Sequence, residues 1–490
     1  MLSCHLLAAA AAGLSAPRAA PPPAATAMRH AVRVRMTADE WGALDLWLQQ
    51  QQQTSPPPRR LRPERTVLSA QGRGLPFFDA LSFEQLGVPA LTVAGLRRCG
   101  FDRPAVVQAA AFSPIASGED TIIAHPAGSG KTLAYALPLV CHLLEVEAAE
   151  GRTADGHVRA LVLVPSSEHA RQTVDLLRGV ANRKLRVSLA TGGNKWRTQR
   201  ERAAEGLEVL VATLGRLQAH LRAGSFSLSD VRRVVLDEAD MAYKDAQLRS
   251  SWDKLRAEVP PSTAFSLVTS TMPSRVAQQT ALDFPTAKLI RSAKLHMTRP
   301  GVWERLIACN GIGAADETGW DRQNMWGKRV DALLAELDAE AFNKVLVLCS
   351  SVSICVRLCE VLTLSADGVK VLSLHGGLDA EERTKALEAL PVATFLQRDS
   401  PTNDLEPYPP RVLLSTERAM RGLDIPDLDT VFLFDFPREG DEYVRSIGKA
   451  TRGERPPANV TFFVHGSQIS MAKAFMTKDE QEEAISLERA

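Results

Sequence analysis

Residues 121–132 read Thr-Ile-Ile-Ala-His-Pro-Ala-Gly-Ser-Gly-Lys-Thr, an apolar run that passes into a glycine-containing loop. A helical pattern begins directly afterwards, at Leu133. Glycines in such a loop allow backbone amides to turn inward around an anion, and the N-terminus of the next helix adds partial positive charge. The stretch therefore predicts a strand, a phosphate-binding loop and a helix, which is the core unit of an α/β fold.

The side chains of this loop suit a nucleotide. Lys131 would reach the β- and γ-phosphates, and the Thr132 hydroxyl would hold Mg²⁺. The rest of the expected phosphate cradle is Ala127, Gly128, Ser129 and Gly130. The strict GxxxxGK[ST] pattern begins with glycine where this chain has His125, so the signature is incomplete. A glycine-rich turn that binds no nucleotide is the alternative.

An acidic tetrad, Asp237-Glu238-Ala239-Asp240, follows the apolar residues Val234–Leu236. Asp237 is expected to hold Mg²⁺ opposite the phosphate loop, and Glu238 to orient and deprotonate an attacking water. An isolated acidic tetrad is usually a solvated turn. Here it ends an apolar strand about 100 residues after a phosphate loop, which favours the catalytic interpretation.

Beyond about residue 78, short apolar runs alternate with amphipathic stretches, a pattern that indicates parallel sheets covered on both faces. The first series of runs is Thr121–His125, Ala160–Val164, Val187–Thr191, Val209–Thr213, Arg233–Asp237 and Phe265–Ser270. The second series is Lys344–Cys349, Val369–Leu374, Arg411–Thr416, Thr430–Asp435 and Asn459–Val464. Two series predict two tandem, doubly wound α/β domains, at 78–298 and 326–470, with ligands at the carboxyl ends of the strands.

The composition excludes several classes of protein. The 490 residues include 58 Lys and Arg against 57 Asp and Glu, a net charge of +1, so a histone-like polycation is excluded and a local basic groove is not. At 45% hydrophobic and 23% charged, the chain is too apolar for wholesale disorder. Seven cysteines without a CxxC pair predict reduced core thiols rather than disulfides or zinc. No run of 18 apolar residues is present, so we expect no membrane span.

The regions outside the two domains differ in composition. Residues 1–36 contain four Arg but no Asp, Glu or Lys, and this predicts a plastid or mitochondrial transit peptide. For this segment, the alternatives are a two-part plastid address and a disordered Ala/Pro leader. For the location of the protein, the alternative to an organelle is the cytoplasm or the nucleus. Residues 37–77 are expected to form a helix from Thr37 and then a flexible linker. Residues 299–325 are the expected interdomain linker, and 471–490 a short acidic tail.

Taken in order, these motifs resemble those of the DEAD-box RNA helicases, a family of superfamily 2 ATPases, over roughly residues 80–470. The resemblance implies two RecA-like domains, ATP as the nucleotide and Mg²⁺ as its metal. Phe101-x-x-Pro104-x-x-x-Gln108 is similar to the family's adenine-reading Q motif. An amide can donate and accept at the adenine edge, and an aromatic ring can stack on the base.

The resemblance also implies an RNA surface of backbone amides and hydroxyls that meets the sugar-phosphate backbone and carries no sequence information. Pro165-Ser166-Ser167-Glu168 is similar to the family's PTREL motif, with Ser167 in place of Arg. Gly192-Gly193 matches a glycine doublet, Thr213-Leu214-Gly215-Arg216 resembles TPGR, and His375-Gly376 with Arg383 resembles a segment of the second domain. The implied RNA contacts are Pro165, Gly193, Thr213, Gly215, Arg216, Gly376 and Thr416.

Two further motifs imply coupling between the domains. Thr269-Ser270-Thr271 looks like the family's SAT motif, whose hydroxyls are expected near Asp240. Thr416 and Arg421-Gly422-Leu423-Asp424 match the motif that touches RNA and the nucleotide ribose, with Asp424 as the acceptor of a ribose hydroxyl. The implied coupling residues are Asp240, Thr269, Thr271, Arg421 and Gly422.

The final motif departs most from the family. Its pattern HRxGRxxR appears as Arg-Ser-Ile-Gly-Lys-Ala-Thr-Arg over residues 445–452. Arg452 is retained, whereas Lys449 stands where the family carries another arginine finger. Lysine keeps the charge but loses bidentate geometry. Since such a finger can be worth about 10³–10⁵ in rate, we expect slow or conditional ATP hydrolysis.

The resemblance thus implies an ATP-dependent RNA helicase with Lys131, Asp237, Glu238, Lys449 and Arg452 as its catalytic residues. An ATP-gated RNA clamp or assembly factor with weak hydrolysis is the alternative that Ser167 and Lys449 favour. A DNA helicase or a phosphoryl-transfer kinase is a third possibility, against which the Q motif and the acidic tetrad weigh. We expect a monomer, with RNA choice set by a protein partner, the N-terminal extension or insertions at 305–330 and 396–410.

Overall fold

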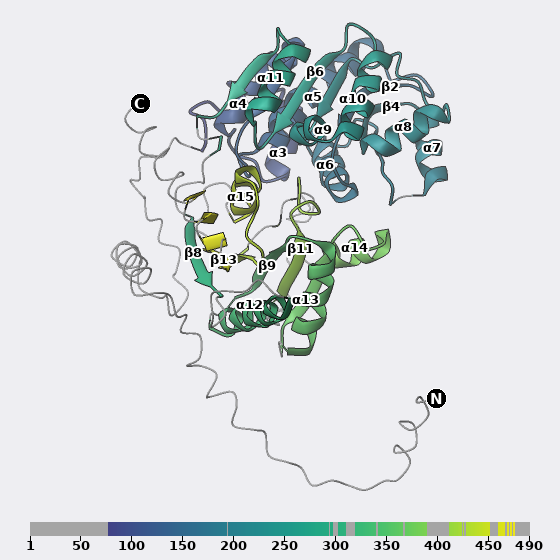
Figure 1. Cartoon of the computed structure of the whole chain (residues 1–490). Helices are drawn as coiled ribbons and strands as arrows, with labels where there is room; N and C mark the ends of the chain where they lie inside the picture. The colour runs from purple at the N-terminus through teal and green to yellow at the C-terminus, as the bar shows by residue number, and fades with distance from the viewer. Residues whose placement is uncertain are drawn as a thin grey trace, which may run out of the picture. The chain divides into compact units, whose positions relative to one another are not determined.

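The computed structural model describes two sheet-based lobes (Figure 1). Lobe 1 comprises residues 77–193, 195–293 and 295–296. Lobe 2 comprises residues 302–309, 319–339, 342–365, 368–389, 411–423, 425, 428–450, 459–465, 468–469, 471–472 and 474–475. The expected transit peptide, the helix from Thr37, the linker that follows it, the insertion at 396–410 and the tail from residue 476 lie outside these ranges, as do Asp424 and Arg452.

Lobe 1 is built on a seven-stranded sheet in the order β3-β4-β2-β5-β6-β1-β7, and the paired strands run parallel. The strands are β1 (Thr121–Ala124), β2 (Val158–Leu163), β3 (Val187–Ala190), β4 (Leu207–Ala212), β5 (Arg233–Leu236), β6 (Ala264–Thr269) and β7 (Lys288–Arg291). Five of them are almost wholly buried, because their near-continuous Val, Leu, Ile and Ala residues supply apolar side chains to both faces.

Helices cover both faces of this sheet (Figure 1). They are α3 (Ala90–Arg98), α4 (Val106–Ser117), α5 (Lys131–Glu150), α6 (Ser167–Val180), α7 (Trp196–Ala204), α8 (Leu214–Arg222), α9 (Ala239–Lys244), α10 (Ala246–Glu258) and α11 (Ser274–Asp283). Residues of α3 to α6 form one hydrophobic cluster and residues of α7 to α11 form another. Successive strand residues alternate between the clusters, as Ile122 and Ile123 do, which is the doubly wound arrangement.

Helix α5 is long and apolar enough, by length and composition alone, to cross a membrane. Most of its residues are buried among the other elements of lobe 1, and it begins at the phosphate loop with Lys131. Its apolar character is therefore that of a core helix. In the described part of the chain six cysteines are free, five of them buried, and no three metal-ligating side chains form a cluster.

Lobe 2 repeats the plan with a six-stranded parallel sheet in the order β10-β11-β9-β12-β13-β8. Its strands are β8 (Trp303–Ala308), β9 (Lys344–Cys349), β10 (Lys370–Leu374), β11 (Arg411–Thr416), β12 (Thr430–Leu433) and β13 (Asn459–Val464). Its helices are α12 (Gly319–Ala339), α13 (Val352–Ser365), α14 (Ala380–Glu388) and α15 (Gly440–Ile447). Two hydrophobic clusters again lie on opposite faces, with Leu346 in one and Val347 in the other.

The prediction of two doubly wound, parallel α/β domains is confirmed. Two strands were missed, and both lie at sheet edges. Strand β7 is mostly exposed, and β8 falls inside residues 299–325, where a linker was expected. Edge strands are covered less completely and so lack the continuous apolar signal of central strands. The segment taken for a linker thus contributes a strand to lobe 2 and contains the start of α12.

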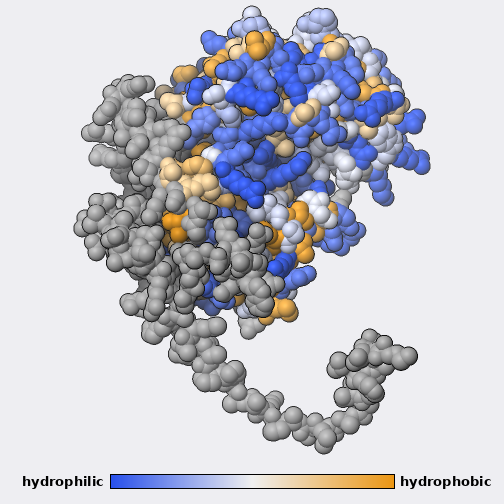
Figure 2. Space-filling view, in the orientation of Figure 1, coloured by the Kyte–Doolittle hydropathy of each residue, from blue (hydrophilic) through white to orange (hydrophobic). Residues whose placement is uncertain are grey.

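The surface is mainly polar on the face that Figure 2 draws, with hydrophobic residues scattered among hydrophilic ones. Exposed large side chains such as Leu282 and Leu364 occur on different lobes. Scattered single hydrophobic residues are ordinary on a globular surface and need no partner to explain them.

One buried charge anchors the edge of lobe 1. Glu208 in β4 is fully buried and accepts hydrogen bonds from Arg186 Nη2 at 2.6 Å and Thr153 N at 3.0 Å. Burial alone would raise the pKa of Glu208, but these bonds outweigh it and lower the pKa from 4.5 to about 2. The folded state therefore gains from ionised Glu208 above pH 4.5, and loses this contribution as the pH falls toward 2.

Replacing Glu208 by Gln should lower the free energy of unfolding by about 3 kcal/mol at pH 7, because it leaves Arg186 without its buried counter-charge. Glu201→Gln is the matched control, since its i,i+4 pair with Arg197 is exposed and should be worth less than about 1 kcal/mol. Denaturant unfolding between pH 7 and pH 3 measures both. Equal losses for the two variants, or a Glu208→Gln deficit that does not shrink in acid, would contradict the assignment.

Candidate nucleotide site and nucleic-acid surface

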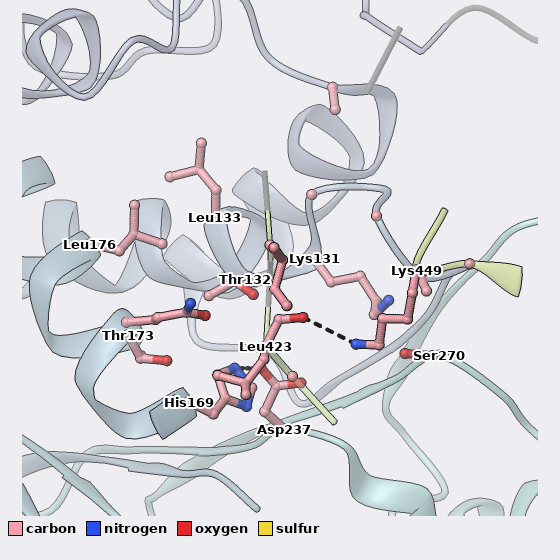
Figure 3. A pocket seen from close by; sticks show the side chains of 18 of the residues that line it. Lys131, Thr132, Leu133, His169, Thr173, Leu176, Asp237, Ser270, Leu423 and Lys449 are labelled. Carbon is pink, nitrogen blue, oxygen red and sulfur yellow. Dashed lines mark hydrogen bonds and ion pairs between the residues drawn. The ribbon is translucent and has the colours of Figure 1, made fainter. Parts of the chain in front are cut away.

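The order of strands in lobe 1 gathers the expected nucleotide residues at one place. Strands β5, β6 and β1 are neighbours, and their carboxyl ends lead into Asp237, Ser270 and the phosphate loop. A cavity of about 570 Å³ opens there, lined by residues of both lobes. Its walls include Phe101, Gln108, the phosphate loop, both Asp237 and Glu238, and Arg421, Gly422, Arg445 and Lys449 from lobe 2. Figure 3 shows part of this cavity.

The phosphate loop has the backbone that its glycines predict. Gly128 and Gly130 adopt φ values of 69° and 90°, which are strained for other residues. Lys131 begins α5 and is mostly buried, with its Nζ donating to the carbonyl of Pro126 at 2.9 Å. The buried Ser129 hydroxyl has no hydrogen-bond partner among the described residues. A donor left unsatisfied inside a loop of this shape fits a bound phosphate.

Gln108 braces the phosphate loop in this structure. Its Oε1 accepts a hydrogen bond from Ala105 N at 2.8 Å, and its Nε2 donates to the carbonyl of Gly130 at 3.2 Å. A side chain at Gly130 would collide with this amide. Gln108 therefore holds the loop through backbone groups, a role that the adenine-reading interpretation did not include.

Aromatic residues line the end of the cavity nearest Gln108. Phe101 lies there as expected, together with Phe77 and Phe78, which were not predicted as site residues. The two adjacent rings meet edge to face at 4.9 Å, and the Arg103 guanidinium lies 5.9 Å from the Phe78 centroid. The available signal for Phe78 was its position at the start of the first predicted domain. These groups provide flat surfaces on which a base can stack.

The two carboxylates at the end of β5 have different surroundings. Asp237 accepts from Glu238 N at 2.8 Å through Oδ1 and from the Tyr135 hydroxyl at 3.1 Å through Oδ2. Glu238 has φ 50°, an uncommon conformation for a residue with a side chain that is often found at functional sites. Its Oε1 accepts from Ser270 at 3.2 Å, whereas its buried Oε2 has no hydrogen-bond partner among the described residues.

The charges around Glu238 keep it ionised. Burial alone would raise the pKa of Glu238, but Lys131, Lys449, Arg421 and Arg445 outweigh burial and hold that pKa below its usual value. Burial raises the pKa of Asp237, and the neighbouring Glu238 raises it further. A carboxylate that is ionised, buried and lacks a partner on one oxygen can accept a proton from a water molecule.

Asp240 joins the lobes. It is fully buried, and it accepts from the hydroxyls of Thr269 and Thr271, each at 3.3 Å. Arg445 of α15 donates from Nη1 to Asp240 Oδ2 at 3.3 Å and to the Thr271 hydroxyl at 3.0 Å. The hydroxyls thus lie at Asp240 as the resemblance implied, and a lobe 2 arginine reaches the same carboxylate.

Arg445 was noted only as a departure from the final motif and was not chosen as a site residue. Its Nε donates to Glu417 Oε1 at 2.7 Å, and Glu417 also accepts from Arg421 Nε at 3.1 Å. Glu417 follows β11 directly and holds both arginines on the cavity wall. The available signal was an arginine in place of the family's histidine at the first position of the final motif.

Lys449 lies on the cavity wall, but its ammonium group is engaged within lobe 2. Its Nζ donates to the carbonyl of Leu423 at 3.1 Å (Figure 3). It also donates to the carbonyl of Met420 at 2.6 Å. In this structure Lys449 fastens the turn that contains Gly422. Asp424 and Arg452, expected at the ribose and the γ-phosphate, lie outside the described residues.

The expected RNA residues of lobe 1 lie at the ends of a second trio of neighbours, β3, β4 and β2. Gly193 and Gly215 are exposed, while Pro165, Thr213 and Arg216 are half-buried. Arg216 donates from Nε and Nη2 to the carbonyls of Thr191 and Gly192, at 3.0 and 2.9 Å. It therefore holds the glycine doublet in shape.

In lobe 2, Gly376 and Thr416 follow or end the neighbouring strands β10 and β11. Gly376 is exposed, whereas Thr416 is mostly buried and its hydroxyl accepts from Ala419 N at 3.3 Å. Arg383 donates to the Gly376 carbonyl at 3.0 Å and lies 3.5 Å from Glu168 of lobe 1. This ion pair thus connects α14 of lobe 2 with α6 of lobe 1, two helices that follow strand-end loops.

Comparison with known proteins agrees with this geometry. A DEAD/DEAH box helicase family matches residues 105–280, and a helicase conserved C-terminal domain matches residues 328–454. DEAD-box ATP-dependent RNA helicase 50 of Arabidopsis thaliana is 31% identical over 412 residues, 83% of this chain and 51% of that protein. Its namesake from Oryza sativa subsp. japonica is 31% identical over 410 residues, 82% of this chain and 62% of that protein. The chain therefore spans about half to three fifths of these relatives.

A solved structure shares the fold. S. cerevisiae Dbp5 bound to RNA and ADP BeF3 superposes with a TM-score of 0.66 at 20% identity, covering 82% of this chain and 93% of that one. The two lobes are thus RecA-like domains, as the resemblance implied.

Proposed function

Because this chain belongs to the DEAD-box RNA helicases, we propose that it is an RNA-dependent ATPase that binds RNA across both lobes and couples ATP turnover to local duplex unwinding or RNP remodelling. The observation that carries this proposal is the contact of Arg445 with Asp240 and Thr271. This contact ties lobe 2 to the acidic tetrad, so the nucleotide site and the contact between the lobes share Asp240.

The residues of lobe 1 fit ATP with Mg²⁺. The unsatisfied Ser129 hydroxyl and the left-handed glycines of the loop suit the phosphates, and Lys131 supplies charge. Thr132 and Asp237 would hold Mg²⁺, which when bound neutralises charge on phosphate oxygens. Glu238 orients a water through its unpartnered Oε2 and accepts the proton of that water.

RNA would lie along the strand-end loops of both lobes. The exposed Gly193, Gly215 and Gly376 offer backbone amides at which no side chain intervenes. Such contacts grip a sugar-phosphate backbone regardless of sequence. We infer that sequence preference comes from a protein partner or from parts of the chain outside the lobes, and that the ATPase acts as a monomer.

A second function is favoured by Lys449. Its ammonium group is bonded to two carbonyls of its own lobe, where the family carries an arginine finger. A chain that closes on RNA and ATP but hydrolyses slowly would act as a clamp or assembly factor. The two functions share binding and differ in turnover and strand release.

We further propose that residues 1–36 direct the protein to a plastid or mitochondrion, because they contain arginine and no acidic residue. Mass spectrometry of the mature N-terminus tests this, and a protein that retains its first 36 residues in cells would contradict it.

The function is tested by ATP hydrolysis of the full chain with and without nucleic acid. Single-stranded RNA should raise kcat at least about tenfold and single-stranded DNA should not, because the 2′-hydroxyl distinguishes the two. Glu238→Gln should bind nucleotide normally and lose hydrolysis by at least about 10², since it removes the proton acceptor. Equal stimulation by DNA, or full turnover in Glu238→Gln, would contradict the proposal.

The choice between helicase and clamp is tested by Lys449→Arg. A guanidinium can contact the γ-phosphate through two donors, so we expect RNA-stimulated kcat to rise at least about fivefold with KM for ATP little changed. Strand displacement of a short duplex should rise in parallel. If Lys449→Arg hydrolyses ATP no faster than wild type, Lys449 does not limit hydrolysis. If wild type hydrolyses ATP without displacing a strand, that result supports the clamp.

A further inference from the structure

His169 is a buried imidazole at the point where the nucleotide site of lobe 1 meets lobe 2. It lies in the first turn of α6 and is 2% exposed. Its backbone N–H donates to the side chain of Ser166, the N-cap, at 3.1 Å. It stands directly after Glu168, where the family's PTREL motif has leucine. A polar ring therefore replaces an apolar side chain on the helix that begins at an expected RNA-contact loop.

One edge of this ring faces the metal-binding carboxylate. His169 Nε2 lies 3.5 Å from Asp237 Oδ2 (Figure 3). The other groups that hold Asp237 are the Tyr135 hydroxyl and the Glu238 amide, which come from lobe 1 as well. Burial lowers the pKa of His169, while the nearby Asp237 and Glu238 raise it. At this distance the contact is one of polar packing, in which the ring occupies the space beside the carboxylate.

The other edge of the ring faces lobe 2. Gly422 adopts φ 68°, and a Cβ built on it would lie closer than 3.0 Å to Nδ1, Cε1 and Cγ of His169. The glycine backbone therefore packs against the imidazole with no room for a side chain. The turn around Gly422 is itself held by Lys449, and by Arg421 through Glu417. Its position is thus set by lobe 2.

We propose that His169 is a positioning residue. It couples the position of the Gly422 turn to the orientation of the Asp237 carboxylate. Packed interiors transmit displacement because they leave little free volume. Lobe 2 then reaches the catalytic centre by a second contact, which shares Glu417 with the contact of Arg445 with Asp240. This inference rests on the proposed function, since it assigns a residue to the same ATPase.

A steric exchange tests the contact between His169 and Gly422. In the full chain, Gly422→Ala should lower RNA-stimulated kcat at least about tenfold, because its methyl group collides with the ring and prevents the turn from seating. His169→Ala removes the ring, so the double variant should recover at least about threefold over Gly422→Ala alone. Gly87→Ala is the matched control: φ is 84° there, nothing lies within 4 Å of its Cβ, and kcat should stay near wild type.

The contact with Asp237 is tested by His169→Leu, which restores the family's apolar side chain and removes the polar edge. We expect kcat to fall about tenfold and the Mg²⁺ concentration for half-maximal rate to rise severalfold, with KM for ATP within about twofold. A purely structural residue would change thermal stability and leave the Mg²⁺ dependence unchanged. Wild-type Mg²⁺ dependence in His169→Leu would overturn the inference, as would additive effects in the steric exchange.

Failure of the proposed function is recognised separately, as a wild-type chain without RNA-stimulated hydrolysis. The same variants are then compared by RNA affinity in the presence of Mg²⁺ and a non-hydrolysable ATP analogue. Recovery of affinity in the double variant supports the contact, and additive losses overturn it.

Discussion

A carboxylate that is fully removed from water needs hydrogen-bond donors around it. Asp240 is such a carboxylate, and the nucleotide site and the contact between the lobes both depend on its donors. Thr269 and Thr271 supply donors from the neighbouring strand end, and Arg445 supplies a positive charge from lobe 2. Burial raises the pKa of Asp240, and the nearby Glu238 raises it further, while Arg445 opposes both. A buried ion pair that loses one partner leaves an uncompensated charge. Lys244 of lobe 1 also lies 3.7 Å from Asp240 Oδ2, so Arg445 completes a charge balance that lobe 1 supplies in part.

The sheet topology makes this arrangement available. Strand ends β5, β6 and β1 bring the acidic tetrad, the threonines and the phosphate loop together, while β3, β4 and β2 bring the loops expected at RNA together. Helix α6 begins at the end of β2 and carries His169 to the edge of the nucleotide cavity. The two groups of loops adjoin where β2 pairs with β5.

Much of the fold and of the nucleotide site could be predicted from the sequence alone. The central strands carry near-continuous apolar runs, and the phosphate loop and the acidic tetrad follow such runs directly, so fold and nucleotide residues could be placed. Edge strands β7 and β8 were missed because partial burial gives them no such run. Gln108 was assigned to a base, and its amide also holds Ala105 and Gly130, which only the approach of two distant segments reveals.

Arg445 and His169 were not predicted as site residues, for a related reason. Each is a polar residue at a position where the family pattern has something else, and sequence shows the departure without showing its partner. The structure supplies Asp240 for one and Asp237 with Gly422 for the other. At these two altered positions the chain therefore makes contacts between the lobes that the sequence alone did not reveal.

The central claim is that Arg445 couples the lobes to ATP turnover through Asp240. The most direct measurement compares wild type with Arg445→Gln for RNA-stimulated ATP hydrolysis and for nucleotide affinity in the absence of RNA. The account predicts that Arg445→Gln loses RNA stimulation by at least about tenfold, while nucleotide affinity stays within about threefold. Retention of RNA stimulation in Arg445→Gln would contradict it.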